Sequence, residues 1–426
     1  MVVFKSLATN LVPNDRNGVV DVFAHDLATG ITELISIGRT GANANDASFP
    51  PTISDDGRFV VFGSWATNLV SLDVNQTPDV FVRDRQTGVT ALVDVAPDGG
   101  QANRGTIDAA PSISGDGSTI AFVSLATNLI GLDTNYLNTF VAPNPLPTPP
   151  VVSRPIQWVN GSPFGGMPDG ASAGPASNVD GTSIAFFSDA SNLIVGDTNG
   201  ARDVFVAEAG SITRVSVSSS GAQANGPSQS LGGSPAISAD GLVIAFYSLA
   251  TNLVPRDMNG WTDVFVRDRA VGTTERISVA SDGTEANGPS FYPSISADGR
   301  FVAFQSTASN LVPGDTNGVS DIFVHDRLTG TTERVCGLQG NAFSLSASIS
   351  PDGNFVAFAS LASNFVPNDT NRHVDVFVCD RAGGTIQRAS VASDGSQGNG
   401  DSILPDISGG MAAAPETPGT PTQTER

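Results

Sequence analysis

Aspartate and asparagine recur at a fixed spacing along the chain and could together bind a metal ion. The stretch NLVPGDTNGVSDIFVHD, from Asn310 to Asp326, places Asp315, Asn317 and Asp321 at positions 1, 3 and 7 of a loop that contains glycine. Carboxylate and amide oxygens suit a hard cation, because calcium takes six to eight oxygen ligands from side chains, backbone carbonyls and water. The spacing therefore predicts a calcium site, although the distal bidentate glutamate of other Asp-rich calcium loops is missing.

The same three positions recur in seven loops, and six of these loops keep both aspartates. We predict metal ligands at Asp15, Asn17, Asp21, Asp73, Asn75, Asp79, Asp197, Asn199, Asp203, Asp257, Asn259, Asp263, Asp315, Asn317, Asp321, Asp369, Asn371 and Asp375. In the seventh loop Asp133 and Asn135 are followed by Asn138, which makes it the poorest candidate. Gln76 and Arg372 replace the loop glycine in two others and predict weaker binding there.

An explanation without metal stays open at this point. Asp and Asn side chains form turns by accepting hydrogen bonds from nearby backbone N–H groups, and Asn-Gly is a favoured turn pair. This accounts for loop positions 1, 3 and 4. It accounts less well for position 7, where an aspartate opens a strand although aspartate is disfavoured in strands. Two carboxylates held close together also repel each other unless they are bridged or solvated.

Internal repetition predicts the fold that positions these loops. An Ala-Thr-Asn or Ala-Ser-Asn triplet marks seven repeats, with its asparagine at Asn10, Asn68, Asn128, Asn192, Asn252, Asn310 and Asn364. Each repeat holds short apolar runs such as RFVAFQS and DIFVHD, separated by Asp-Gly and Thr-Gly turns, which is typical of antiparallel strands. Because both faces of these runs are apolar, each sheet should pack between two neighbours. We therefore predict an all-β, seven-bladed propeller of four-stranded antiparallel blades.

The two ends of the chain complete one repeat. The segment Asp401–Gly410 matches a first strand, whereas MVVFKSLATN at the start matches a second strand. We predict that residues 1–410 form the propeller, with the ring closed by pairing between the N-terminal strands and the C-terminal strand, and that residues 411–426 form a disordered Pro/Thr-rich tail. Blade three, about residues 115–180, should be irregular, because prolines exclude a regular central strand at positions 143, 145, 147, 149 and 150.

The charge and the cysteines limit the classes of partner and cofactor. Lys and Arg number 21 against 42 Asp and Glu, a net charge of −21, which opposes binding to nucleic acid or anionic lipid. No apolar run has the ~18 residues of a membrane span, so membrane insertion is not expected. Cys336 and Cys379 lie in different repeats and at different places within the repeat. We therefore predict neither a disulfide nor a zinc site.

The residues favour a binding protein over an enzyme. Only His25, His325 and His373 are present, and neither Gly-x-Ser-x-Gly nor His-Glu-x-x-His occurs. A glycosidase needs two singular carboxyl groups that face each other, whereas the carboxylates here are repeated. A propeller-scaffold carbohydrate-active enzyme, a lyase or a hydrolase, remains an alternative.

Units that read SADGRFVAF and then DIFVHDRLTGTTER resemble the repeats of the TolB-type, WD-repeat-like β-propeller family, and SPDGNFVAF at residues 350–358 matches most closely. The resemblance covers residues 1–410 and implies a secreted or periplasmic bacterial binding protein. The long loops and the absence of a separate N-terminal domain depart from TolB, so no role in its envelope system is implied. We expect a non-enzymatic, calcium-stabilised extracellular or periplasmic module that binds a protein or glycan ligand as a scaffold. A self-assembling surface or adhesion protein is a further alternative.

Overall fold

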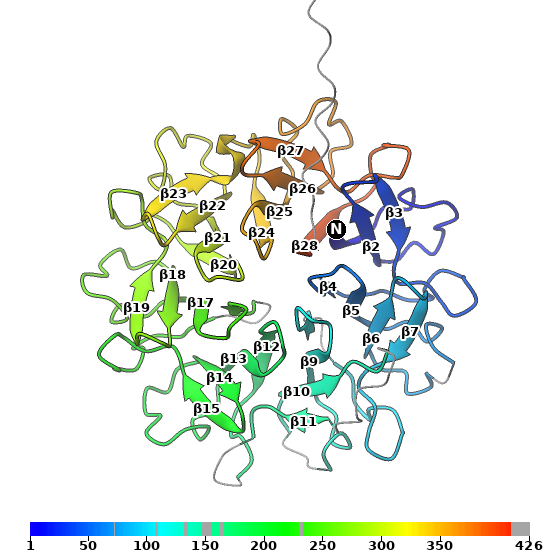
Figure 1. Cartoon of the computed structure of the whole chain (residues 1–426), viewed down its shortest axis with the longest axis horizontal. Helices are drawn as coiled ribbons and strands as arrows, with labels where there is room; N and C mark the ends of the chain where they lie inside the picture. The colour runs from blue at the N-terminus through cyan, green and yellow to red at the C-terminus, as the bar shows by residue number, and fades with distance from the viewer. Residues whose placement is uncertain are drawn as a thin grey trace, which may run out of the picture.

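The computed structural model shows seven sheets arranged as blades around a central axis (Figure 1). It describes residues 1–71, 73–106, 110–131, 135–146, 156–161, 166–229 and 233–409, and the predicted tail at 411–426 lies outside them. Within these residues every sheet has four antiparallel strands that follow one another from the axis to the rim. This confirms the predicted seven-bladed propeller. The described part of the chain contains no helix with the length and apolar character needed to cross a membrane.

Each of the first four blades runs outwards from the axis through four strands. Blade one has β28 (Ser402–Ile407), β1 (Val2–Ser6), β2 (Asp21–Asp26) and β3 (Ile31–Leu34). Blade two has β4 (Thr52–Ile53), β5 (Phe59–Ser64), β6 (Asp79–Asp84) and β7 (Val89–Leu92). Blade three has β8 (Ser112–Ile113), β9 (Thr119–Ser124), β10 (Asn138–Pro143) and β11 (Gln157–Trp158). Blade four has β12 (Ser172–Ser177), β13 (Ser183–Ser188), β14 (Asp203–Glu208) and β15 (Ser211–Arg214).

The remaining three blades follow the same order. Blade five has β16 (Ala236–Ile237), β17 (Val243–Ser248), β18 (Asp263–Asp268) and β19 (Thr273–Arg276). Blade six has β20 (Ser290–Ile295), β21 (Phe301–Ser306), β22 (Asp321–Asp326) and β23 (Thr331–Arg334), followed by the 3-10 turn η1 (Val335–Gly337). Blade seven has β24 (Ser344–Ile349), β25 (Phe355–Ser360), β26 (Asp375–Asp380) and β27 (Thr385–Arg388).

The second and third strands of each blade bury both of their faces. Every residue of β5, β13, β17 and β25 is buried, as the continuous apolar runs of the sequence predict. In all seven blades a phenylalanine of strand two packs against one of strand three, with ring centroids 5.8–6.1 Å apart. Burial of such a side chain contributes roughly 1.5–3 kcal/mol, so these pairs form the apolar centre of each blade.

The two ends of the chain close the ring. Strand β1 pairs antiparallel with β28, with Val2 opposite Ile407 and Ser6 opposite Ser402. The Ser6 and Ser402 hydroxyl oxygens are 2.8 Å apart. An equivalent serine pair joins strand two to strand one, or to the segment just before it, in blades two, four, five, six and seven at 2.8–3.1 Å. The closing contact therefore repeats the contacts inside the chain and confirms the predicted closure.

Blade three keeps four strands despite its prolines. Its third strand ends at Pro143, and its fourth strand, β11, has only two residues, with Trp158 opposite Phe140. The prolines at 147, 149 and 150 lie outside the described residues.

The prediction that the two cysteines do not pair is wrong. Cys336 and Cys379 form a disulfide, with Cα atoms 5.9 Å apart, that joins blade six to blade seven. Their different places within the repeat do not separate them, because the segment after the fourth strand of one blade packs against the outer strands of the next blade. The same contact elsewhere carries a hydrogen bond, for example from Thr332 Oγ1 to the Val279 carbonyl oxygen at 2.5 Å.

Candidate functional site

The predicted metal ligands of blade six gather around an arginine. Asn317 donates from Nδ2 to Asp321 Oδ2 at 3.0 Å and to the Gly340 carbonyl oxygen at 3.1 Å. Arg334, which ends β23, has its guanidinium 3.3 Å from Asp315 and 3.5 Å from Asp321. The three predicted side chains therefore converge, and a guanidinium lies where we predicted a bound cation.

The same arginine bridge occurs in blades four to seven. In each blade the arginine ends the fourth strand, and its side chain is at most 8% exposed. The further bridges join Arg214 to Asp197 and Asp203 at 2.8 and 3.4 Å, Arg276 to Asp257 and Asp263 at 3.2 Å each, and Arg388 to Asp369 and Asp375 at 3.1 and 3.5 Å. A metal ion in any of these loops would compete with a buried guanidinium.

Blades one and two lack this arginine. Leu34 ends β3 and Leu92 ends β7, at the place where β19 ends in Arg276. The carboxylates of these two loops accept hydrogen bonds from amides, which join Asn43 to Asp15 at 3.0 Å, Asn17 to Asp21 at 2.7 Å, Gln101 to Asp73 at 3.2 Å and Asn75 to Asp79 at 2.8 Å. We call blades one and two the arginine-free blades.

Blade three replaces the strand-opening carboxylate by an amide. Asn138 stands at this position, and its Oδ1 accepts a hydrogen bond from Asn160 Nδ2 at 3.1 Å. Asn160 Oδ1 in turn accepts the Thr139 N–H at 3.0 Å. Asp133 lies outside the described residues. The amide pair needs no counter-charge.

Burial raises the pKa of the loop carboxyl groups. It raises the pKa of Asp79 to about 7 and that of Asp21, Asp257 and Asp321 to about 6. The same cause raises the pKa of Asp15, Asp73, Asp197, Asp203, Asp263, Asp369 and Asp375. A carboxylate removed from water in this way is stable in its charged form only with a positive group or several donors beside it.

The loops supply oxygen ligands that calcium prefers, but the metal sites stay a prediction. Asn17, Asn75, Asn199, Asn259, Asn317 and Asn371 all donate their Nδ2 hydrogens to the strand-opening aspartate. Among the described residues, no group of three or more His, Cys, Asp or Glu side chains is placed so that it could hold a metal ion.

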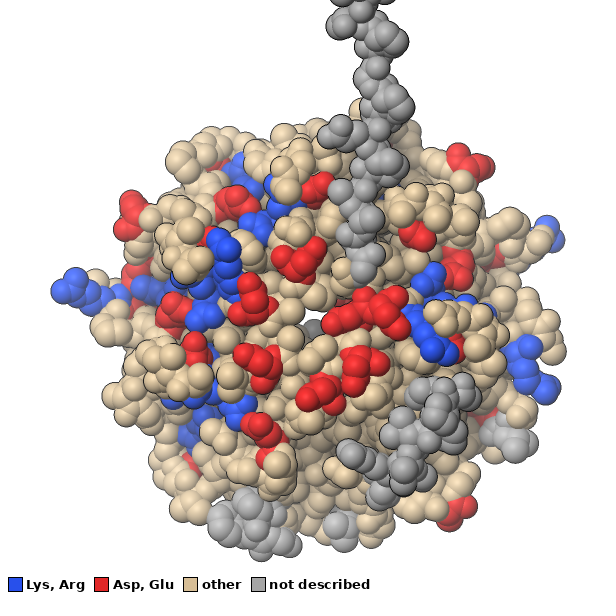
Figure 2. Space-filling model, in the orientation of Figure 1, with Lys and Arg blue, Asp and Glu red and all other residues tan. Residues whose placement is uncertain are grey.

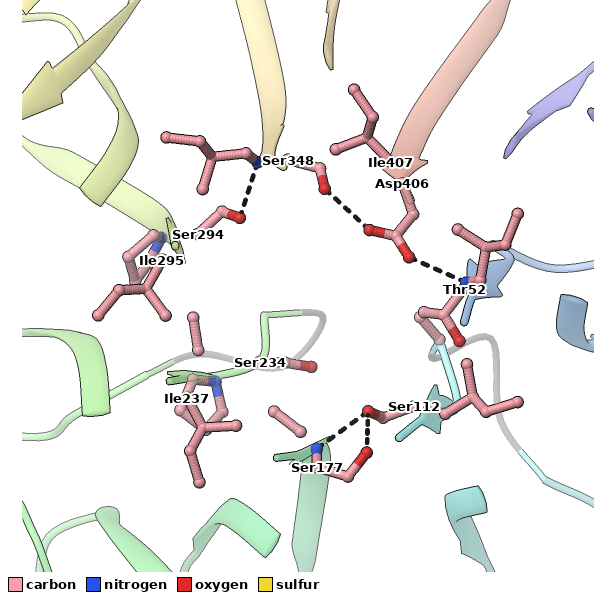
Figure 3. Close-up of a pocket in the computed structure, with 18 of the residues that line it drawn as sticks. Thr52, Ser112, Ser177, Ser234, Ile237, Ser294, Ile295, Ser348, Asp406 and Ile407 are labelled. Atoms are coloured by element: carbon pink, nitrogen blue, oxygen red, sulfur yellow. Dashed lines mark hydrogen bonds between the residues drawn. The ribbon is translucent and has the colours of Figure 1, made fainter. Parts of the chain in front are cut away.

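A second candidate site is the central channel, a cavity of about 620 Å³ (Figure 3). The first strand of every blade lines it, largely with proline, isoleucine, serine and alanine residues. Hydrogen bonds link neighbouring first strands, for example from the Ile349 N–H to Ser294 Oγ at 3.0 Å and from the Ser177 N–H to Ser112 Oγ at 3.0 Å. These contacts hold the innermost strands at a fixed radius around the cavity.

Asp406 breaks the symmetry of the channel. It lies in the ring position occupied by Thr52, Ser112, Ser294 and Ser348 in other blades. Its Oδ1 accepts the Ser348 hydroxyl at 2.8 Å, and its Oδ2 accepts the Ile53 N–H at 3.0 Å (Figure 3). Its position deep in the ring raises the pKa of this carboxyl group through burial.

The hairpins between first and second strands form a belt around one mouth of the channel. Backbone hydrogen bonds join their tips from blade to blade, for example from the Ala239 N–H to the Ala297 carbonyl oxygen at 2.9 Å and from the Gly409 N–H to the Asp55 carbonyl oxygen at 2.9 Å. The residue after each bonded tip is an exposed aspartate in six blades, namely Asp56, Asp116, Asp180, Asp240, Asp298 and Asp352. Figure 2 shows acidic side chains gathered around the central opening on this face.

The histidines form no common site. His25 and His325 lie in blades one and six, and each shares a hydrogen bond of 2.8 Å through Nδ1 with a threonine of its own blade. His373 contacts Asp401 at 3.1 Å near the surface.

Comparison with known proteins places the chain at the level of fold. No family model and no curated protein matches the sequence. Among solved structures, the β-propeller domain of the Trilobed protease from Pyrococcus furiosus matches at 12% identity and TM-score 0.53, over 87% of this chain and 89% of that chain. A prolyl endopeptidase matches at 14% identity and TM-score 0.52, over 87% of this chain but only 46% of that chain. The putative TolB from Agrobacterium tumefaciens matches at 14% identity and TM-score 0.43, over 78% and 87% of the two chains.

These likenesses show a β-propeller and nothing finer. The two peptidase structures share the fold at low identity, and the TolB superposition is too loose to support an argument. The sequence resemblance to TolB-type repeats therefore stays a resemblance of fold.

Several residues of these sites are not among the sequence-based predictions. The endings TTERV and TIQRA differ from ITELI and VTALV by arginine against leucine, and this difference identifies the two arginine-free blades. Asp406 stands out only once strand one is aligned across the repeats. The hairpin aspartates resemble ordinary turn formers in the sequence, and they do form turns, since Asp298 Oδ1 accepts the Arg300 N–H at 3.0 Å.

Replacement of Arg276 by leucine, which copies the arginine-free blades, is expected to lower the free energy of unfolding by about 3 kcal/mol, because it leaves buried carboxylates without their counter-charge. Arg276→Leu is compared by chemical denaturation with Arg300→Leu, since the Arg300 side chain is 38% exposed against 8% for Arg276. The exposed pair should contribute less than about 1 kcal/mol. Equal losses in the two variants would contradict a structural role for the buried bridge.

Asp406→Asn is expected to reduce the dependence of stability on pH. Because the folded protein raises the pKa of Asp406, protonation favours folding, and this stability is lost as the pH rises through the folded value. The melting temperature of the parent protein should therefore fall more than that of Asp406→Asn as the pH rises from about 4, the ordinary pKa of an aspartate, towards neutrality. Parallel pH profiles would show that Asp406 does not titrate in this range.

Proposed function

We propose that this protein is a non-enzymatic binding module that works outside the cytoplasm and takes a positively charged segment of its ligand into the central channel. The observation that carries the proposal is the ring of six exposed aspartates around one mouth of a cavity of about 620 Å³ that holds a further carboxyl group, Asp406. Carboxylates around a narrow opening concentrate the electrostatic potential there and attract cations. A basic segment of a protein fits this chemistry better than a neutral glycan does.

Two features support the wider setting of the proposal. The disulfide between Cys336 and Cys379 fits an oxidising compartment, such as the periplasm or the cell exterior. The net charge of −21 opposes contact between copies of the chain, so a cationic partner is favoured over self-assembly.

Calcium is the second part of the proposal, and it is confined to the arginine-free blades. There the aspartates Asp15, Asp21, Asp73 and Asp79 have no arginine beside them among the described residues, whereas arginine already neutralises the corresponding pairs in blades four to seven. A hard cation in blades one and two would supply the same neutralisation from solution.

The channel proposal is tested with a lysine-rich peptide titrated into the protein by calorimetry, with a glutamate-rich peptide for comparison. Replacement of Asp240, Asp298 and Asp352 together by asparagine keeps the turn acceptors but removes three charges from the mouth. At about 0.5 kcal/mol per charge, binding should weaken about tenfold. The matched control is the triple asparagine variant of Asp98, Asp282 and Asp394, which are exposed aspartates in the same kind of turn but in the connectors between blades. Equal weakening in both triples, or no binding of the basic peptide, would contradict the proposal.

The calcium proposal predicts that EGTA lowers the melting temperature of the parent protein. A ligand that binds only the folded state stabilises it by about 2.7 kcal/mol per site at a hundredfold excess over Kd. The double variant Leu34→Arg with Leu92→Arg should abolish the effect of EGTA, because an arginine then neutralises the aspartates in place of calcium. Arg276→Leu should enlarge the effect, because calcium can then take the place of the arginine. If melting is indifferent to EGTA in all three proteins, the loops bind no calcium.

A further inference from the structure

Blade two has a carboxylate where four other blades have a serine. In blades one, four, five and seven, a serine after the fourth strand donates its hydroxyl to the strand-opening aspartate at 2.5–2.6 Å, through Ser36, Ser216, Ser278 and Ser390. Blade two has Asp94 at this position. The side chain that supplies a donor in other blades therefore supplies a second negative charge here.

Two carboxylate oxygens in this place have no partner. Asp94 Oδ1 accepts the Val80 N–H at 3.1 Å, and Asp79 Oδ1 accepts Asn75 Nδ2 at 2.8 Å. The Oδ2 atoms of Asp79 and Asp94 are buried without a hydrogen-bond donor, and both side chains belong to fully buried residues. Thr77 Oγ1, in the loop just before Asp79, is a third buried oxygen without a partner. Buried polar atoms are nearly always satisfied in folded proteins, so the unpartnered carboxylate oxygens of Asp79 and Asp94 point to a missing group.

The charge balance indicates what that group is. In blade four, Asp197 and Asp203 are set against Arg214, which leaves a net charge of −1. In blade two, Asp73, Asp79 and Asp94 have no described guanidinium or ammonium beside them, so the three groups carry a net charge of −3 when all are ionised. The difference of two unit charges equals one divalent cation.

We propose that blade two binds one divalent hard cation between the carboxylates of Asp79 and Asp94. The inference rests on the proposal that the arginine-free blades bind calcium, and it adds Asp94, which lies outside the repeated loop motif. The donors are all oxygens, which selects calcium over softer metals. Asp73, which neighbours Asp79, supplies the remaining negative charge.

The proposed site has two carboxylate ligands, from Asp79 and Asp94, and the protein does not supply a complete set of charged ligands. No described group of three acidic, His or Cys side chains is placed to hold a metal, so the remaining ligands must be hydroxyl, carbonyl or water oxygens. A single proton shared by the two carboxyl groups is the competing occupant, because it would also satisfy one of the facing oxygens.

The test is a calorimetric titration of calcium into chelator-stripped full-length protein, with Asp94→Ser as the variant. This change restores the residue of four other blades and should therefore fold. Asp98→Asn is the matched control, since Asp98 is an exposed aspartate in the same connector. We expect the parent protein and Asp98→Asn to bind one more equivalent of calcium than Asp94→Ser. In EGTA, Asp94→Ser should melt at a higher temperature than the parent, because it lacks the unbalanced carboxylate.

The outcomes separate this inference from the proposal beneath it. If the parent and Asp94→Ser bind the same number of calcium ions, the site between Asp79 and Asp94 is refuted while the loop proposal stands. If the parent binds no calcium at all, both fail. If Asp94→Ser is more stable than the parent at every calcium concentration by the same amount, the carboxyl pair holds a proton and no metal, which also overturns the inference.

Discussion

The buried aspartate that opens the third strand is the constraint on which the long loops depend. In six blades this carboxylate is 0–2% exposed, so it needs donors or a positive charge beside it. The chain meets the need in different ways: a serine hydroxyl and an arginine in blades four, five and seven, and amides with a serine but no arginine in blade one. Blade three avoids the problem with Asn138. Blade two does the opposite and adds a second carboxylate, Asp94. The same buried aspartate position is thus neutralised, or replaced, in a different way in different blades.

The closed ring buries these aspartates and also positions the groups that balance their charge. Each blade packs both faces against neighbours, so the ends of its inner strands are shielded from water even where they carry charge. The segment after the fourth strand lies against the third strand of the same blade, which brings the serine, the arginine and the aspartate together. It also reaches the next blade, where Cys336 meets Cys379. The same enclosure places Asp406 in the channel, where neighbouring strands supply its two donors. Loops, disulfide and channel are therefore consequences of one closed ring.

The fold was predictable because the sequence repeats the pattern of one blade seven times. Repeat length, strand runs with two apolar faces and the complementary ends of the chain predicted the blades and the pairing of β1 with β28. The contents of the loops were less predictable, because they depend on a contact across the blade: the motif Asp-x-Asn-Gly-x-x-Asp is local, whereas Arg334 reaches Asp315 from the fourth strand. The disulfide was missed for a related reason, since it joins two repeats at positions that never align. Asp94 and Asp406 are residues that differ from the repeat consensus. Their roles could not be predicted from the sequence, because they depend on the side chains that lie beside them in the folded protein.

The central claim is that the charge inside each of the six loops with two aspartates is balanced either by arginine or by a cation from solution. The most direct measurement is anomalous diffraction from crystals soaked in a lanthanide ion that substitutes for calcium. The account predicts anomalous peaks beside Asp21 in blade one and between Asp79 and Asp94 in blade two, and none beside Arg214, Arg276, Arg334 or Arg388. Peaks in the loops that carry arginine, or no peak in either arginine-free blade, would contradict it.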